Sequence, residues 1–221
     1  MDWRVREQSL AQLEGPLRRF SGAIDECFAV LDAALEEFAG RANEDSFMFF
    51  CGVTATKARR LAWGYLSLAL DGLSADAPIL LRPLLEAFEL LVYFEQDPSR
   101  IAEAREDRLP SPGNVAKAIE GSFAQTRRYL NRHSSHIGYS VEAVLHLVDH
   151  KALRFRGSPR FDAQALHESM QTLSMVLGLI NRSALDCLER DPAAKLDSLR
   201  RRERNVRKRC QRAARALAGA L

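Results

Sequence analysis

Apolar residues recur every three or four positions along most of this chain, which is the spacing of amphipathic helices. Three such stretches fill the first half, at residues 17–38, 47–69 and 76–95. The third is the most apolar, and we expect Asp76 to cap it, with Pro78 in its first turn. Because this helix carries so few polar residues, we expect it to lie at the centre of the fold.

The second half of the chain is expected to be helical with one exception. Ser111 or Asn114 is placed to cap a helix that reaches His133, and a short helix is expected over residues 140–150. Residues 151–159 form the one segment that favours an extended conformation, as a small hairpin or as a loop.

A long helix is predicted from Asp162 to Arg190, and a tail helix from Asp191 onward. No alternation of apolar and polar residues is long enough for a sheet, and no internal repeat occurs. The predicted fold class is therefore all-α, a helical bundle of about five main helices with a basic C-terminal helix. We expect residues 1–190 to form the bundle domain, and residues 191–221 to form the basic helix, packed on the bundle or extending from it.

Positive charge is concentrated in this tail. The formal net charge is +3, yet residues 195–215 hold ten basic and two acidic residues, so the tail carries about +8 and the preceding residues about −5. Apolar residues recur in the tail at helical spacing, so one side can pack while the arginines face away. Such a face can neutralise nucleic-acid phosphates, or it can lie against the acidic body or a dimer mate. The candidate nucleic-acid-binding residues are Arg200, Arg201, Arg204, Arg207 and Lys208.

Several classes of protein are disfavoured by the composition. The first ten residues are polar and charged, so no secretory signal is expected. The longest apolar run, residues 79–94, contains Arg82, Glu86 and Glu89, so no membrane span is predicted. The cysteines have no paired spacing, which favours a reducing, cytoplasmic location with the thiols as small core residues. They are Cys27, Cys51, Cys187 and Cys210.

Polar residues form a stripe on the apolar helix 76–95. They follow one another at steps of three and four and therefore share one face, and Arg82 and Glu86 form an i,i+4 pair. The stripe is either a solvated face or the wall of a crevice that orients residues of a neighbouring helix. Its members are Arg82, Glu86, Glu89, Tyr93 and Gln96.

The layout LLRPLLEAFELLVYFEQDP, with YLNRHSSH about thirty residues later, resembles a family of uncharacterised bacterial all-helical proteins. That family is related to the HEPN (higher eukaryotes and prokaryotes nucleotide-binding) superfamily. In its pattern an apolar helix carries Arg and Glu four apart and an aspartate near its end, and a later helix carries Tyr and then His. The matching residues are Arg82, Glu86, Asp97, Tyr129 and His136. The resemblance covers residues 47–188 and implies a HEPN-like helical bundle that works on RNA, which we expect to be a homodimer.

Many HEPN proteins are metal-independent ribonucleases with an Arg followed by His four to six residues later. The resemblance implies that Arg127 or Arg128 steadies the phosphate, and that His133, or His136 in its place, transfers the proton. Arg82, Glu86 and Tyr129 would support that site.

Helix geometry restricts this arrangement. On a straight helix Arg127 and Arg128 lie about 120–140° from His133, so they meet at one phosphate only through a helix distortion or a second subunit. His133 instead shares a side with Thr126 and Tyr129, which we expect to face the core.

Two alternatives to an RNA-directed protein follow from other features. His146 and His150 lie four residues apart and can chelate zinc or nickel, as in a metal-binding helical enzyme. A non-enzymatic helical interaction or dimerisation module, pairing with a protein from a neighbouring gene, is the main alternative. The sequence has no glycine-rich phosphate loop and no nucleophile elbow. No cofactor is predicted. The preferred function is RNA binding, as a metal-independent ribonuclease or as a non-cleaving relative.

Overall fold

The computed structural model describes residues 3–15, 17–133, 147–149, 154–155 and 157–218. These residues form an all-α bundle, as predicted, apart from one short β-hairpin. The described ranges contain nine α-helices, where about five main helices were expected. The elements in chain order are α1 (Trp3–Glu14), α2 (Arg18–Ala39), α3 (Ser46–Leu70), η1 (Ala77–Leu80), α4 (Leu81–Gln96), η2 (Pro98–Arg100), α5 (Ile101–Arg105), α6 (Pro112–Ala118), α7 (Ala124–His133), β1 (Val148–Asp149), β2 (Arg154–Phe155), α9 (Ala163–Leu188) and α10 (Asp197–Ala218).

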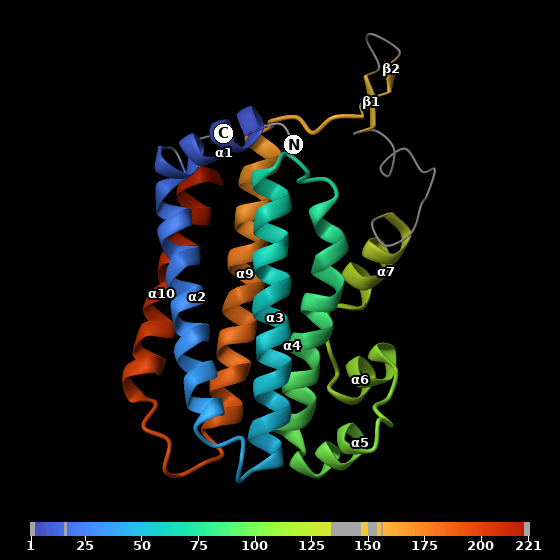
Figure 1. Cartoon of the computed structure of the whole chain (residues 1–221), viewed down its shortest axis with the longest axis vertical. Helices are drawn as coiled ribbons and strands as arrows, with labels where there is room; N and C mark the ends of the chain where they lie inside the picture. Colours follow the sequence, from blue (N-terminus) through green and yellow to red (C-terminus); the bar gives the residue numbers. More distant parts are fainter. Residues whose placement is uncertain (1–2, 16, 134–146, 150–153, 156, 219–221) are drawn as a thin grey trace.

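The long helices run side by side along the longest axis of the molecule (Figure 1). Helix α9 packs against α2, α3 and α4, and α10 lies against α2 and α9. Helix α1 crosses one end of the bundle, while α5, α6 and α7 lie beside α4 (Figure 1). Large side chains fill the space between the long helices and are fully buried; they include Phe20, Leu31, Phe94 and Met170.

Two of the long helices begin at an aspartate that satisfies a free N–H group of the first turn. Asp45 Oδ1 accepts a hydrogen bond from the Phe47 N–H at 2.7 Å, and Asp162 Oδ1 accepts one from the Ala165 N–H at 3.0 Å. The predicted cap at Asp162 is confirmed. The predicted cap at Asp76 is wrong, because the chain enters α4 through the 3-10 helix η1 and Asp76 makes no side-chain cap bond there.

The single helix predicted from Ser111 to His133 is two helices, α6 and α7. Between them Glu120 has a φ of 53°, in the left-handed region that interrupts a helix. Gly121 follows, and a Cβ at this position would lie 3.1 Å from Oε1 of Glu89 on α4. The turn therefore comes close to α4, and glycine is the residue that permits this approach.

The hairpin joins two short segments of the second half. Val148–Asp149 pairs antiparallel with Arg154–Phe155, so the extended conformation expected within residues 151–159 is confirmed as a hairpin strand. Val148–Asp149 was predicted to belong to a helix, and that prediction is wrong at these two residues. The rest of the predicted helix over 140–150 lies outside the described residues.

The first and the last helix both differ from the prediction. Helix α1 was not predicted, and the tail helix starts at Asp197 rather than at Asp191. Asp191 instead accepts hydrogen bonds from Arg41 Nε at 2.6 Å and from the Ala193 N–H at 2.9 Å, which hold it in a turn. In the described part of the chain, no helix has the length and apolar character needed to cross a bilayer.

Helix α10 packs through its apolar side, as its sequence pattern predicts. The residues on that side are buried and belong to the same core as the helices of residues 1–190. They are Leu199, Val206, Cys210 and Ala213, with Leu196 directly before the helix.

Candidate functional site

The polar stripe of α4 forms a wall that is packed at Glu89 and Tyr93, partly exposed at Arg82 and Glu86, and exposed at Gln96. Glu89 is completely buried, and Tyr93 is 4% exposed. Arg82 Nε and Glu86 Oε1 form the predicted i,i+4 ion pair at 2.9 Å. The Tyr93 hydroxyl donates a hydrogen bond to Glu103 Oε2 on α5 at 2.9 Å. The stripe thus faces the segment that contains α5, α6 and α7. This arrangement agrees with the second interpretation of the stripe, in which it forms the wall of a crevice.

The central contact of this wall is an ion pair between Glu89 on α4 and Arg127 on α7. Arg127 Nη1 donates a hydrogen bond to Glu89 Oε1, and the two side chains are 14% and 0% exposed. Within the described residues, Glu89 Oε2 has no hydrogen-bond partner. Burial raises the pKa of Glu89 above its ordinary value, while the hydrogen bond and charge of Arg127 act in the opposite direction. Arg127 is thus the group that offsets the cost of burying this carboxylate.

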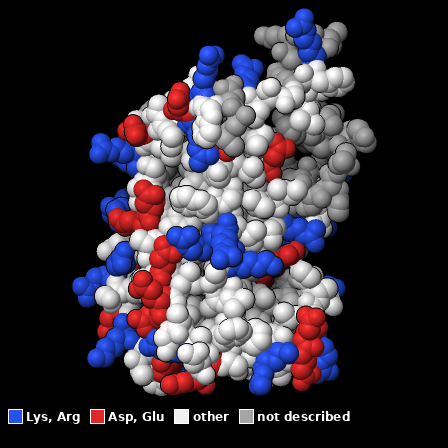
Figure 2. Space-filling view, in the orientation of Figure 1, with Lys and Arg blue, Asp and Glu red and all other residues white. Residues whose placement is uncertain are grey.

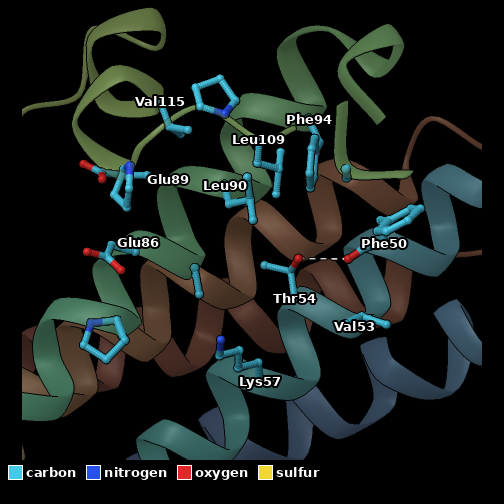
Figure 3. A pocket seen from close by; sticks show the side chains of 15 residues that line it. Phe50, Val53, Thr54, Lys57, Glu86, Glu89, Leu90, Phe94, Leu109 and Val115 are labelled. Atoms are coloured by element: carbon cyan, nitrogen blue, oxygen red, sulfur yellow. Dashed lines mark hydrogen bonds between the residues drawn. The ribbon is translucent and has the colours of Figure 1, made fainter. Parts of the chain in front are cut away.

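A pocket of about 340 Å³ opens beside this wall, between α3, α4 and the segment that leads from α5 to α6. Figure 3 shows Glu86 and Glu89 at one side of the pocket, with Phe50 and Phe94 at the other. Lys57 reaches toward the pocket from α3 (Figure 3), and it has no acidic partner among the described residues. The pocket is therefore apolar through most of its wall and charged at one edge.

The residues predicted to be catalytic do not converge in the described part of the chain. Arg127 is turned inward against Glu89, whereas Arg128 beside it is exposed. His133 is the last residue of α7, and His136 lies outside the described residues. The structure therefore joins one predicted catalytic residue, Arg127, to the polar stripe, and it leaves the Arg–His arrangement a prediction.

The predicted packed side of α7 is confirmed in part. Tyr129 was expected to face the core together with Thr126, but it is 55% exposed, whereas Thr126 is partly buried. Leu130, which was expected on the same side, is buried at 2% exposed. The packed side of α7 is therefore centred nearer to Arg127 and Leu130 than to Tyr129.

The histidines support no metal centre in the described residues. His146 and His150, the predicted chelating pair, lie outside them. His167 on α9 packs its ring 5.6 Å from the ring of Phe20. Within the ranges described, no three His, Cys, Asp or Glu side chains are grouped closely enough to hold a metal ion.

The candidate nucleic-acid-binding residues of α10 fall into two groups. Arg200 forms ion pairs with Asp186, at 2.6 Å, and with Glu189 on α9. Arg207 Nε lies 3.4 Å from Glu203 Oε1. These two arginines are engaged with the protein itself.

The other three candidates, together with one further arginine of α10, form what we call the basic row: Arg201, Arg204, Lys208 and Arg212. All four are exposed, and none has a carboxylate partner in the described chain. At 100° per residue they lie within about 80° of one another, on the side opposite Val206 and Cys210. Figure 2 shows basic side chains along the edge of the molecule where α10 lies, beside a column of acidic side chains over α2. Arg212 was not among the sequence candidates, although its spacing from Lys208 is the signal that identifies it.

In comparisons with protein-family models, curated proteins and solved structures, nothing matches this chain.

Proposed function

We propose that this protein binds RNA through the basic row of α10. The observation that carries the proposal is the row itself, four exposed cations in line without carboxylate partners in the described residues. An unpaired cation gains its full attraction to a phosphate, and its binding releases counterions from the nucleic acid. Arg200 and Arg207 would first have to leave Asp186, Glu189 or Glu203, so we assign them a smaller part.

The spacing of the basic row suits a phosphate backbone. From Arg201 to Arg212 the row spans about 16 Å, at 1.5 Å per residue. One strand of nucleic acid carries a phosphate about every 3.4 Å of axis, so the row faces about five phosphates. Helix α10 has no aromatic residue on which a base could stack, so we expect backbone contacts and little preference for base sequence.

The HEPN resemblance also suggests cleavage, and here we favour the non-cleaving form. Arg127 is held by Glu89, and an arginine that moved to a phosphate would leave this buried carboxylate without its charge partner. Arg128 is exposed and able to reach a phosphate, but helical spacing places it about 140° from His133 on α7. A homodimer that completes such a site stays a prediction.

Binding is tested by titrating a fluorescent single-stranded RNA of about twenty nucleotides with wild-type protein and with Arg201→Glu/Lys208→Glu. We expect the variant to bind roughly tenfold or more weakly, and the log–log salt slope to fall from about −3 to about −1.5. The control is Arg18→Glu/Arg19→Glu, which changes the same charge at exposed positions of α2. An equal loss in both variants, or no loss in either, would contradict the role of the basic row.

Cleavage is tested separately with the same RNA and with a structured hairpin, in the presence of EDTA. The non-cleaving form predicts intact RNA after prolonged incubation. Cleavage that disappears in His133→Ala or His136→Ala would show a ribonuclease instead. Cleavage that persists in both variants would indicate a contaminating nuclease.

A second candidate function, binding of a small organic molecule, is favoured by the pocket beside α4. Its wall is mainly apolar, and Lys57 at its edge is free to pair with an acidic group. Val53→Trp should obstruct this pocket, since Val53 lines it and is 51% exposed. Ile79→Trp, at a position 46% exposed and outside the pocket lining, is the control. The fluorescent probe 1-anilinonaphthalene-8-sulfonate should lose binding only in the first variant; equal binding in both would reject this candidate.

A further inference from the structure

The four cysteines, far apart in the sequence, form two contact pairs in the fold. Cys27 on α2 and Cys210 on α10 are neighbours and line the same cavity. Cys51 on α3 and Cys187 on α9 are also neighbours. All four are free thiols. The chain thus contains two pairs of the same chemistry in different surroundings.

Access to solvent distinguishes the two pairs. Cys27 and Cys210 line a cavity of about 460 Å³ between α9 and α10, and Cys210 is 9% exposed. Cys51 and Cys187 are both completely buried. A dissolved reagent can therefore approach the first pair through the cavity, whereas the second pair becomes accessible only when the bundle opens.

The two thiols of the accessible pair are not equivalent. The neighbouring side chains of Cys27 and Ser174, together with the positive charge of Arg209, hold the pKa of Cys210 below its ordinary value, although burial opposes this. The pKa of Cys27 is raised by its contact with Cys210, by burial and by the charge of Glu203. Cys210 is 9% exposed and Cys27 only 1%, so a dissolved disulfide meets Cys210 first; Cys210 is therefore the attacking thiol, and Cys27 is the thiol that resolves the mixed disulfide.

We propose that Cys27 and Cys210 form an oxidisable site that reacts with a low-molecular-weight disulfide, such as glutathione disulfide, and closes to a disulfide between α2 and α10. Arg182 and Arg207 line the same cavity together with Glu203; Arg182 is paired with Asp186 and Arg207 with Glu203, so they would bind the carboxylates of such a peptide disulfide by exchanging these partners. The inference is independent of RNA binding, because it concerns the inner side of α10 and not the basic row.

The reaction consists of two thiol–disulfide exchanges. The Cys210 thiolate attacks one sulfur of glutathione disulfide, a mixed disulfide forms, and the first glutathione leaves as a thiolate and takes up a proton. The Cys27 thiol then loses its proton and attacks the Cys210 sulfur, so that the second glutathione leaves. Two protein thiols are oxidised and one disulfide is reduced to two thiols.

The test uses the full-length protein under native conditions. After incubation with glutathione disulfide, free thiols are blocked by alkylation in denaturant and the digest is analysed by mass spectrometry without reduction. We expect a peptide pair joined through Cys27 and Cys210, with Cys51 and Cys187 alkylated. Formation of the Cys51–Cys187 bond at an equal rate, or oxidation of all four only in denaturant, would overturn the proposal.

Variants identify the order of the two steps. Cys27→Ala should accumulate glutathione on Cys210, because the second exchange has no attacking thiol. Cys210→Ala should form neither the mixed disulfide nor the bond, while Cys51→Ala/Cys187→Ala should behave as wild type. Glutathione found on Cys27 in Cys210→Ala at the wild-type rate would contradict the assignment of Cys210 as the attacking thiol. The wild-type measurement decides the main question even where a variant does not fold.

Discussion

At the scale of single residues, the most informative contact is the one between Glu89 and Arg127, which are 38 positions apart in the sequence. Helical spacing placed Glu89 on one stripe with Arg82 and Glu86, and the Arg82–Glu86 pair followed from that spacing alone. Helical spacing could not predict that Arg127 is the partner of Glu89, because this contact depends on a turn at Gly121 that brings α7 against α4. A carboxylate in so apolar a helix does signal that some cation must approach it.

Replacing Arg127 should destabilise the fold substantially. In Arg127→Met the buried Glu89 carboxylate loses its charge partner, and we expect the free energy of unfolding to fall by about 3 kcal/mol at pH 8. Urea unfolding followed by circular dichroism measures this loss. Arg128→Met, which removes a neighbouring exposed charge, should change stability by less than about 0.5 kcal/mol.

The loss of stability in Arg127→Met should depend on pH. Arg127 lowers the pKa of Glu89, so its removal raises that pKa further above the model-peptide value of 4.5. A carboxyl whose pKa is raised by folding holds more protons in the folded state, so it favours folding as the pH falls toward its unfolded pKa. The difference between Arg127→Met and wild type should therefore be smaller at pH 5 than at pH 8. A difference that grows on acidification would show that Glu89 is not the residue left unpaired.

At the scale of elements, the helices that were predicted correctly are those whose signals are local. Helix α9 begins where Asp162 can cap it, and α2 and α3 follow apolar spacing within two residues at each end. The predictions failed where a tertiary contact decides the backbone. Residues 111–133 have helical spacing throughout, yet the close approach of Gly121 to Glu89 divides them into α6 and α7.

The cap at Asp162 should contribute measurably to stability. Asp162→Ala removes the acceptor of the Ala165 N–H, and we expect a loss of about 1 kcal/mol in the free energy of unfolding. Ser111→Ala is a suitable comparison, because Ser111 occupies the same position before α6 but makes no side-chain cap bond. Denaturant titration of both variants should separate them; equal losses would mean that the Asp162 bond contributes nothing beyond helix propensity.

At the scale of the whole molecule, the basic tail helix α10 shares its apolar core with the helices of residues 1–190. The sequence correctly predicted that one side of the tail packs and the other faces outward. It could not predict that the packed side carries Cys210 to Cys27, since contact between residues so far apart depends on how α10 lies against α2. It also could not show which arginines are used internally, as Arg200 is with Asp186 and Glu189.

If α10 is part of the common core, damage to its packed side should destabilise the entire bundle. Val206 is 2% exposed, so Val206→Asp buries a carboxylate that has no partner of opposite charge. We expect a single unfolding transition, with the free energy of unfolding lowered by about 3 kcal/mol or more. Asn205→Asp adds the same charge at the adjacent exposed position and should leave stability nearly unchanged. A Val206→Asp protein that retains the wild-type transition would mean that α10 is an appendage. The same reasoning explains why RNA binding is better tested by charge reversal in the basic row than by deletion of the tail, because deletion would expose the α2 and α9 surfaces that α10 covers.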